Sequence, residues 1–457
     1  MGEQLLVYVP GWPARIEAFL PKDRLARLAG RELARGGAVR ILDYGTPAHL
    51  ERFSFLCPSS DSLADPESLS WWRQPWLRWN LSEKMRQWHT DISREIGRHR
   101  PHAVVYLAET AGDYFQARQV ALRVRDMRPD TPQAVCGPFA ELLGAHDKRR
   151  APFTGACPAC GLDSPTGMTG EGEGSLPCHS PAVYPALYGG GKFQVFPLSL
   201  DRPPTLELMR APAVAREMRE MDAGVAVRVF HVDGVLSAAE AGELAAELLA
   251  RRVEGQYSLG CLPGPQSDSV WALSRAAGCR AVEWLVPSGS QRLIDDYYRL
   301  PFGMSEARRA VRMCRMAGIF TAVRMLWPCP EDDRHTRAES AYFLEKAQPD
   351  SVMLDTPRAT ERPDSRHAGD RHGLLDELRN RGFTVQMRAW QGMTARLCGH
   401  ENRESRFLAR LGDAVCDGDW AVLSDEIAAF NRELAQPRPR AVPDWDGNGD
   451  AYAAVAN

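Results

Sequence analysis

The sequence predicts an α/β protein in which a doubly wound parallel sheet is followed by a second, barrel-like series of βα units. Three observations lead to this fold class. Apolar runs of strand length alternate with helical stretches along most of the 457 residues. A Gly-, Pro- and Ser-rich stretch at residues 145–192 divides this alternation into two series. The composition, 44% hydrophobic and 25% charged, is that of a globular protein with a large core.

The first series has four short apolar strands, each followed by a helix or a turn. Strands are expected at residues 5–9, 39–42, 103–107 and 133–135, and helices at 23–34, 82–99 and 114–127. Ligands of such sheets bind beyond the carboxyl ends of the strands. We therefore expect a ligand face formed by the loops at 10–22, 109–114 and 137–141.

The second series has seven apolar strands separated by six helical stretches. Strands are expected at 193–200, 225–232, 256–259, 281–286, 320–326, 351–354 and 384–389, and helices at 213–221, 238–251, 268–277, 305–316, 337–345 and 372–381. This succession predicts a full or partial (β/α) barrel with its chemistry at the carboxyl ends of the strands. Short helical stretches and a Pro-, Gly- and Asp-rich tail, residues 437–457, form a small C-terminal region.

Charge and hydropathy exclude several classes of partner. A formal net charge of −3 provides no basic field for nucleic acid. The most apolar runs, at 225–232 and 281–287, are too short to span a membrane. The first residues lack the features of a signal peptide, and eleven cysteines without one do not indicate a disulfide framework. We expect a cytoplasmic protein.

Several short motifs, in this order, resemble those of the cobalamin (B12)-binding class of radical SAM enzymes. They are Leu20-Pro21-Lys22-Asp23, Gly137-Pro138-Phe139-Ala140, Gly170-Glu171-Gly172-Glu173, Phe230-His231-Val232-Asp233 and Ser288-Gly289-Ser290. The resemblance implies a Rossmann-like B12-binding domain at 1–145 and a linker with a cysteine cluster and a Gly-Glu-Gly-Glu hinge at 146–192. It then implies a radical-SAM-type partial (β/α) barrel at 193–395 and a helical C-terminal extension and tail at 396–457.

The same resemblance implies a set of cofactor-binding residues. The corrin of cobalamin would lie over strand-end loops, with its nucleotide tail running down between strands. The residues marked by the resemblance are Glu109, Thr110, Gly112, Tyr114, Gly137, Pro138 and Glu171, with Ser288 and Gly289 on the barrel side. No D-x-H-x-x-G motif occurs, so no protein histidine is expected on cobalt. A retained but empty sheet is the alternative, and SAM binding is left open.

The chain departs from the family at its iron–sulfur motif. Family members hold a [4Fe–4S] cluster with a C-x3-C-x2-C loop after the first barrel strand, whereas residues 198–209 of this chain contain no cysteine. No C-x3-C-x2-C occurs anywhere in the sequence, and Pro287 replaces the usual Glu before Ser-Gly-Ser. Oxygen ligands are poor substitutes for thiolate at such a centre. We therefore expect no [4Fe–4S] cluster at the usual site.

Four soft or borderline ligands cluster in the linker. Cys157 and Cys160 form a C-x2-C turn, and Cys178-His179 follows at a spacing found in zinc loops. Zinc is one interpretation of this group. The others are ordinary surface thiols in a loop, a hairpin disulfide that forms only after oxidation, and a relocated iron–sulfur cluster.

Ionisable residues near strand ends are the catalytic candidates. Asp332, Asp333 and His335 follow the strand at 320–326, where they could orient a polar substrate or move a proton. The alternative is a helix cap, with Thr336 as N-cap and Glu339 three residues on. Arg324, like Arg228 and Arg388, is a charged residue within a strand, and inside a barrel it needs an ion-pair partner or an anionic ligand. Exposed strand faces would explain these three arginines equally well. The resemblance adds Asp233, at the end of an earlier strand.

Two functions follow from these observations. The first is a cobalamin-dependent enzyme that acts on a polar small metabolite, by methyl transfer or cobalt-initiated radical chemistry, in a biosynthetic role. The second is a catalytically silent paralogue that serves as scaffold or partner subunit of an active radical SAM enzyme. The ionisable residues near the strand ends favour the enzyme.

Overall fold

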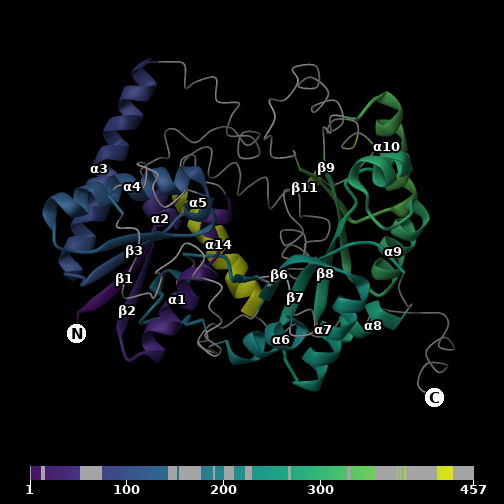
Figure 1. Ribbon diagram of the computed structural model, residues 1–457, viewed down its shortest axis with the longest axis horizontal. Helices are drawn as coiled ribbons and strands as arrows, with labels where there is room; N and C mark the ends of the chain where they lie inside the picture. Colours follow the sequence, from purple (N-terminus) through teal and green to yellow (C-terminus); the bar gives the residue numbers. More distant parts are fainter. Residues whose placement is uncertain are drawn as a thin grey trace.

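The protein contains two parallel sheets that lie side by side, the first at the left of Figure 1 and the second at the right. The computed structural model describes residues 2–11, 16–51, 75–142, 152–153, 177–188, 191–199, 210–221, 229–265, 269–326, 331–355, 378, 381, 385–386 and 419–435. Both sheets are flanked by helices, so the predicted α/β class with parallel sheets is confirmed.

The first sheet has the strand order β2-β1-β3-β4, with every pair parallel. Its strands are β1 (Glu3–Tyr8), β2 (Ala38–Asp43), β3 (Ala103–Leu107) and β4 (Gln133–Cys136). The chain passes from β1 to β2 on one side and returns to β3 on the other. The carboxyl ends of β1 and β3 therefore flank a topological switch point, where α/β sheets bind ligands.

Helices of this unit bury one apolar face each. The long ones are α1 (Asp23–Ala34), α3 (Pro75–His99) and α4 (Ala111–Met127), and α2 (Pro47–Leu50), α5 (Pro138–Leu142) and the 3-10 helix η1 (Ile16–Phe19) are short. Thr110 caps α4 by accepting a hydrogen bond from the Asp113 amide at 3.2 Å, while the Asp113 carboxylate accepts one from the Thr110 amide at 2.9 Å. This capping box sets where β3 ends and α4 begins.

The second sheet has seven parallel strands in chain order, β5 at one edge and β11 at the other. They are β5 (Val195–Ser199), β6 (Val229–Leu236), β7 (Gln256–Cys261), β8 (Cys279–Leu285), β9 (Phe320–Leu326), β10 (Ser351–Asp355) and β11 (Val385–Gln386). The helices α6 (Arg210–Glu220), α7 (Ala238–Ala250), α8 (Ser269–Ala276), α9 (Met304–Met316) and α10 (Arg334–Ala347) cover its outer side (Figure 1). Successive neighbouring strands joined by helices on one face are the arrangement of a partial (β/α) barrel.

Side chains alternate between the two faces of this sheet. In β8, Val282 and Trp284 belong to the core formed with the outer helices, where Trp284 meets Trp271 of α8 edge-to-face at 5.1 Å. Ala281 belongs instead to a separate core cluster, together with Phe320 and Ala322 of β9. Because the period of a strand is two, Glu283 and Arg324 share the inner face with Ala281 and Ala322.

The structure also contains elements that the sequence did not predict. A π-helix, η11 (Leu293–Tyr298), follows β8, and a 3-10 turn, η9 (Pro185–Leu187), precedes β5. The helical C-terminal region that the sequence predicted contains α14 (Trp420–Ala435), which lies between the two sheets in Figure 1 and packs against α2. The helix expected at 372–381 lies almost entirely outside the described residues. No helix in the described part of the chain could cross a membrane.

Candidate functional site

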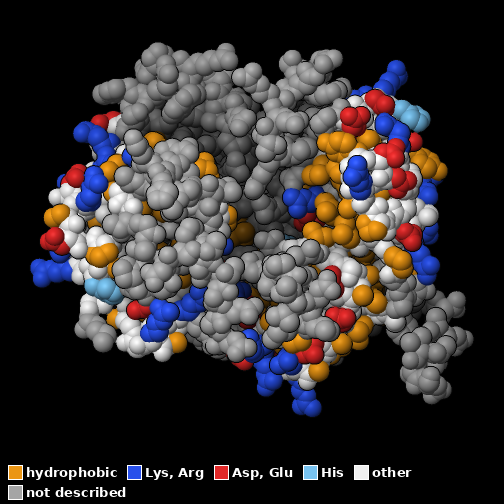
Figure 2. Space-filling view, in the orientation of Figure 1, with side chains coloured by type: hydrophobic (Ala, Val, Ile, Leu, Met, Phe, Trp, Pro, Cys, Tyr) orange, Lys and Arg blue, Asp and Glu red, His pale blue; other side chains and the backbone are white. Residues whose placement is uncertain are grey.

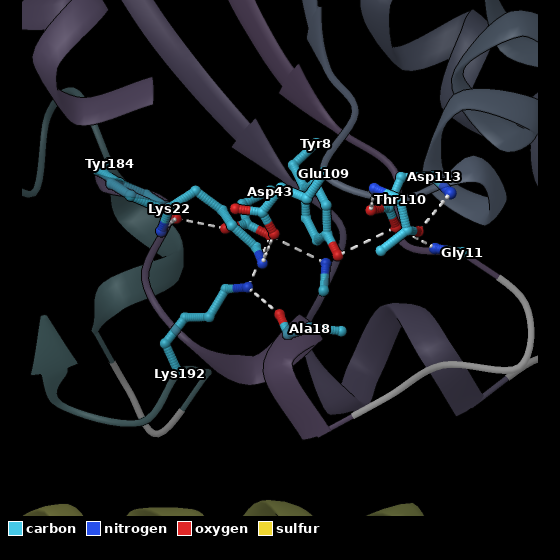
Figure 3. Close-up of polar contacts among 11 residues, drawn as sticks. Tyr8, Gly11, Ala18, Lys22, Asp43, Glu109, Thr110, Asp113, Tyr184 and Lys192 are labelled. Carbon is cyan, nitrogen blue, oxygen red and sulfur yellow. Dashed lines mark hydrogen bonds and ion pairs between the residues drawn. The ribbon is translucent and has the colours of Figure 1, made fainter. Parts of the chain in front are cut away.

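A network of charged side chains, most of them buried, occupies the carboxyl edge of the first sheet (Figure 3). Lys22 Nζ lies 2.7 Å from Glu109 Oε2, joining the start of α1 to the loop after β3. Lys192 Nζ lies 2.8 Å from Asp43 Oδ1, joining the segment before β5 to the end of β2. The side chains of Lys192 and Asp43 are both 0% exposed. Ammonium groups at this depth are tolerated only when they are paired and hydrogen-bonded.

Further hydrogen bonds complete this network. Lys192 Nζ donates to the Ala18 carbonyl, and the Tyr184 hydroxyl donates to Asp43 Oδ2. The Lys22 amide donates to the same hydroxyl oxygen at 2.9 Å, and Lys22 Nζ lies 4.1 Å from the centre of the Tyr8 ring. The segment that leads into the second sheet is therefore attached to the first by buried polar bonds.

Burial lowers the pKa of both lysines and nearby carboxylates raise it, but the balance differs between the two. Burial lowers the pKa of Lys192 to about 8, although the Asp43 carboxylate opposes the shift. Burial also lowers the pKa of Lys22, but Glu109 and then Asp43 outweigh it, so that pKa is raised. Lys22 is thus held as a cation, whereas Lys192, with its pKa lowered to about 8, loses its proton at a lower pH than an ordinary lysine.

Asp113 links the loops that follow β1 and β3 at the topological switch point. Its Oδ1 accepts hydrogen bonds from the Gly11 amide at 2.6 Å and from the Tyr8 hydroxyl at 3.3 Å. A Cβ on Gly11 would lie 3.0 Å from the Gly112 carbonyl carbon, so the two loops are in backbone contact. Asp113 and Gly11 thus hold the loops that follow β1 and β3 close together at this point.

Three residues expected to bind the cofactor are also held by other interactions. Thr110 caps α4, and Tyr114 is buried, with its ring 5.5 Å from that of Phe139 and 5.7 Å from that of Phe153. Glu109 pairs with Lys22, while its side chain remains 39% exposed at the edge of the sheet. Glu109 and Thr110 are both exposed at this edge of the sheet.

Gly137 has a local reason to be glycine. Its φ is +113°, and a Cβ there would lie 2.4 Å from the Ala108 carbonyl oxygen. The turn that places Pro138 at the start of α5 thus depends on close backbone packing against the end of β3. Glu171 lies outside the described residues.

Four polar side chains from neighbouring strands gather on the inner face of the second sheet. Arg324 Nη1 lies 3.3 Å from Glu283 Oε1, with side chains 39% and 11% exposed. His231 Nδ1 lies 2.8 Å from Ser258 Oγ, where β6 and β7 pair residue to residue. Arg324 thus has the ion-pair partner that a charged residue within a barrel strand requires. This group is the candidate functional site of the second unit.

Sequence reasoning identified Arg324 here but did not select Glu283, His231 or Ser258. The available signal was a carboxylate inside the apolar run 281–287, two residues from Ala281 on the same strand face. Asp233 lies within β6, opposite Ser199 of β5, because the strand continues to Leu236 rather than ending near residue 232. Its side chain is not among those that the structure describes. Arg228 and Arg388 lie outside the described residues.

Helix α10 has a different N-cap residue from the one that the sequence suggested. The N-cap is Asp333, whose Oδ1 accepts hydrogen bonds from the His335 and Thr336 amides at 2.8 Å. These two bonds lower the pKa of Asp333. Thr336 is buried and donates to Asp332 Oδ1 at 3.1 Å, so the prediction of Thr336 as N-cap is wrong. The Asp333 side chain is committed to holding the helix.

His335 lies on the outer surface. Its side chain is 82% exposed, and its Nε2 lies 3.4 Å from Glu339 Oε1, one turn along α10. Figure 2 shows acidic, basic and histidine side chains interspersed over this helix. Asp332, by contrast, is buried against Thr336. The three residues proposed together from the sequence therefore have three different environments.

Ser288 and Gly289 form a buried turn after β8. Ser288 Oγ accepts a hydrogen bond from the Ser290 amide at 3.1 Å, and the Gly289 amide donates to Ser340 Oγ of α10 at 2.9 Å. A Cβ on Gly289 would lie 2.5 Å from the Ser340 Cα. The absence of a side chain at Gly289 thus permits close packing of this turn on α10.

The expected metal ligands are described only in part. Cys157 and Cys160 lie outside the described residues. The Cys178 amide donates to the Ala26 carbonyl at 2.9 Å, and the buried His179 ring lies 4.8 Å from the ring of Phe196. Among the residues that the structure describes, no three His, Cys, Asp or Glu side chains are grouped to hold a metal ion.

The chain is similar, at low sequence identity, to several solved structures. No protein-family model matches the chain, and no curated protein matches it. The chain is 14% identical to the radical S-adenosylmethionine methyltransferase TsrM from Kitasatospora setae, solved with cobalamin and a [4Fe–4S] cluster, over 78% of this chain and 72% of that chain, with a TM-score of 0.46. It is 10% identical to OxsB, a cobalamin-dependent S-adenosylmethionine radical enzyme solved with aqua-cobalamin, over 91% of this chain and 66% of that chain, also with a TM-score of 0.46. Both are enzymes of the class that the motifs resemble.

Proposed function

We propose that this protein is a cobalamin-dependent, radical-SAM-like enzyme that acts on a polar small metabolite by methyl transfer or cobalt-initiated radical chemistry. The observation that carries the proposal is the Glu283–Arg324 pair on the inner face of the second sheet, near the carboxyl ends of β8 and β9. Charged side chains are costly inside a barrel, and active sites of such folds lie at this end. A barrel with only a structural role would not require charged side chains on its inner face.

The pair has the chemistry to bind an ionic substrate. Arg324 remains a cation at every accessible pH, and its planar guanidinium matches a carboxylate or phosphate in two-point geometry. Glu283 orients that guanidinium from the neighbouring strand. His231, held beside Ser258, adds an imidazole whose ring nitrogens can donate or accept a proton. We infer that Arg324 binds the substrate and that His231 holds or moves a proton.

The cofactors belong to the same proposal. Cobalamin would lie on the outer face of the loops at Glu109, Thr110, Gly112 and Gly137, and would supply the methyl-transfer or radical reactivity. We place the B12-binding domain at 1–145, the linker at 146–192, the barrel at 193–395 and the extension at 396–457. Because the sequence lacks C-x3-C-x2-C, we propose that the usual SAM-cleaving [4Fe–4S] cluster is absent.

The full-length protein, made anaerobically with cobalamin supplied, tests this function. We expect equilibrium dialysis to show about one hydroxocobalamin per chain, and iron analysis to show less than one [4Fe–4S] cluster. Arg324→Gln should leave cobalamin binding unchanged, as should the exposed control Arg312→Gln on α9. Absence of cobalamin binding would reject the cofactor assignment. Co-purification with an active radical SAM enzyme, without bound cobalamin, would indicate the silent partner instead.

A further inference from the structure

A pocket of about 340 Å³ lies at the outer edge of the first sheet, and the proposed function does not use it. Four segments that are distant in the sequence line it. They are the end of β2 with α2 (Ile41 to His49), Glu95 of α3, the stretch from Pro185 to Gly191, and Ser424 of α14. Its volume is in the range of small-molecule sites, which begins at roughly 300 Å³.

The lining combines apolar walls with acidic charge. Ile41, Leu42, Pro47 and Pro185 provide apolar surface. The described lining residues include the carboxylates of Asp43 and Glu95 and neither lysine nor arginine. The charge of Asp43 is balanced by Lys192, so Glu95 determines the charge that a ligand would meet.

Glu95 lies beside a group of side chains that contact one another. Burial raises the pKa of the Tyr44 hydroxyl, and the charge of Glu95 raises it further. The His49 ring meets the Tyr44 ring edge-to-face at 4.9 Å, and its Nδ1 lies 2.6 Å from Thr46 Oγ1. A cation placed beside Glu95 would thus find a fixed wall of aromatic and hydroxyl groups.

We propose that this pocket binds a small primary amine with an apolar or aromatic body. The ammonium group would pair with the Glu95 carboxylate, and the body would lie against Ile41, Pro47 and Pro185. Because α14 and the stretch before Lys192 also line the pocket, the bound amine would contact the first sheet, the connection to the second and the C-terminal helix together. Occupancy would therefore stabilise the arrangement of these three parts.

Isothermal titration calorimetry on the full-length protein, with 2-phenylethylamine as the probe, tests this proposal. We expect the amine to bind and the anionic 3-phenylpropionate to bind at least about tenfold more weakly, since only the amine can pair with Glu95. Glu95→Gln keeps the shape of the side chain and should weaken amine binding by about tenfold or more. Asp91→Asn, one turn earlier on α3 and 44% exposed, should change it less than about twofold.

A second variant tests the location of the site. Ala48 is exposed on the rim of the pocket, so Ala48→Trp should fold normally and block binding of the probe. Absence of amine binding to the wild-type protein would overturn the proposal. Equal binding of amine and acid, unchanged binding to Glu95→Gln or unchanged binding to a folded Ala48→Trp protein would overturn it as well.

Discussion

Arg27 and Glu217 form a two-point ion pair between the two α/β units. Nη1 and Nη2 of Arg27, on α1, donate to the two carboxylate oxygens of Glu217, on α6, each at 2.6 Å. Nε of Arg27 donates to Asp23, one turn earlier on α1, also at 2.6 Å. Burial lowers the pKa of Arg27, but Asp23 and Glu217 outweigh it, so the pKa is raised. This contact fixes the orientation of α1 relative to α6.

Loss of this ion pair should destabilise the protein. The side chains of Arg27 and Glu217 are 25% and 20% exposed, so Arg27→Gln leaves two carboxylates partly buried without their cation. We expect the free energy of unfolding to fall by about 1–3 kcal/mol. Urea unfolding measures it, with Arg31→Gln on the same helix as the control. Equal effects of the two substitutions would show that the pair contributes nothing.

Lys192 should make stability depend on pH above neutrality. Its pKa is lowered to about 8 in the folded protein, against an ordinary value near 10.4, so between these values the unfolded chain binds the proton more strongly. Stability from this group therefore rises with pH, by roughly 1.5 kcal/mol between pH 8 and pH 9.5. Unfolding of Lys192→Met should lack this rise. The exposed Lys346→Met should retain it, and parallel pH curves for wild type and Lys192→Met would contradict the assignment.

Neighbouring residues at the start of α10 should respond very differently to substitution. Thr336 is buried and hydrogen-bonded to Asp332 and to the Asp333 amide, so Thr336→Val should cost about 1–2 kcal/mol. His335 is 82% exposed, and His335→Ala should change stability by less than about 0.5 kcal/mol. Thermal unfolding of the two variants provides the comparison. A larger loss for His335→Ala would contradict the observed cap.

Gly289 should not tolerate a side chain. In Gly289→Ala the new Cβ would lie 2.5 Å from the Ser340 Cα and 2.8 Å from the Phe343 Cβ, and neither atom is the end of a flexible side chain. We expect a loss of about 1–3 kcal/mol from this overpacking. Gly264→Ala is the control, because no atom of the described residues lies within 4 Å of a Cβ there. Comparable denaturation midpoints for the two variants would show that α10 can move away.

Local periodicity in the sequence was sufficient to place most strands and helices. The helix expected at 23–34 and the strands at 103–107 and 320–326 have the predicted bounds, because each shows its apolar period within its own residues. At the start of α10, however, the sequence fits two capping boxes. Burial of Thr336 against Asp332 decides between them, and burial is set by packing rather than by the local pattern.

The charged groups of the site required the tertiary structure. The sequence alone determined the α/β class, the division into two series and the absence of C-x3-C-x2-C. It could not pair Lys22 with Glu109, which lies 87 residues away, or Lys192 with Asp43. Nor could it select Glu283 as the partner of Arg324. Such pairs form only where separate strand ends meet at one edge or one face of a sheet, and that meeting depends on strand order and register.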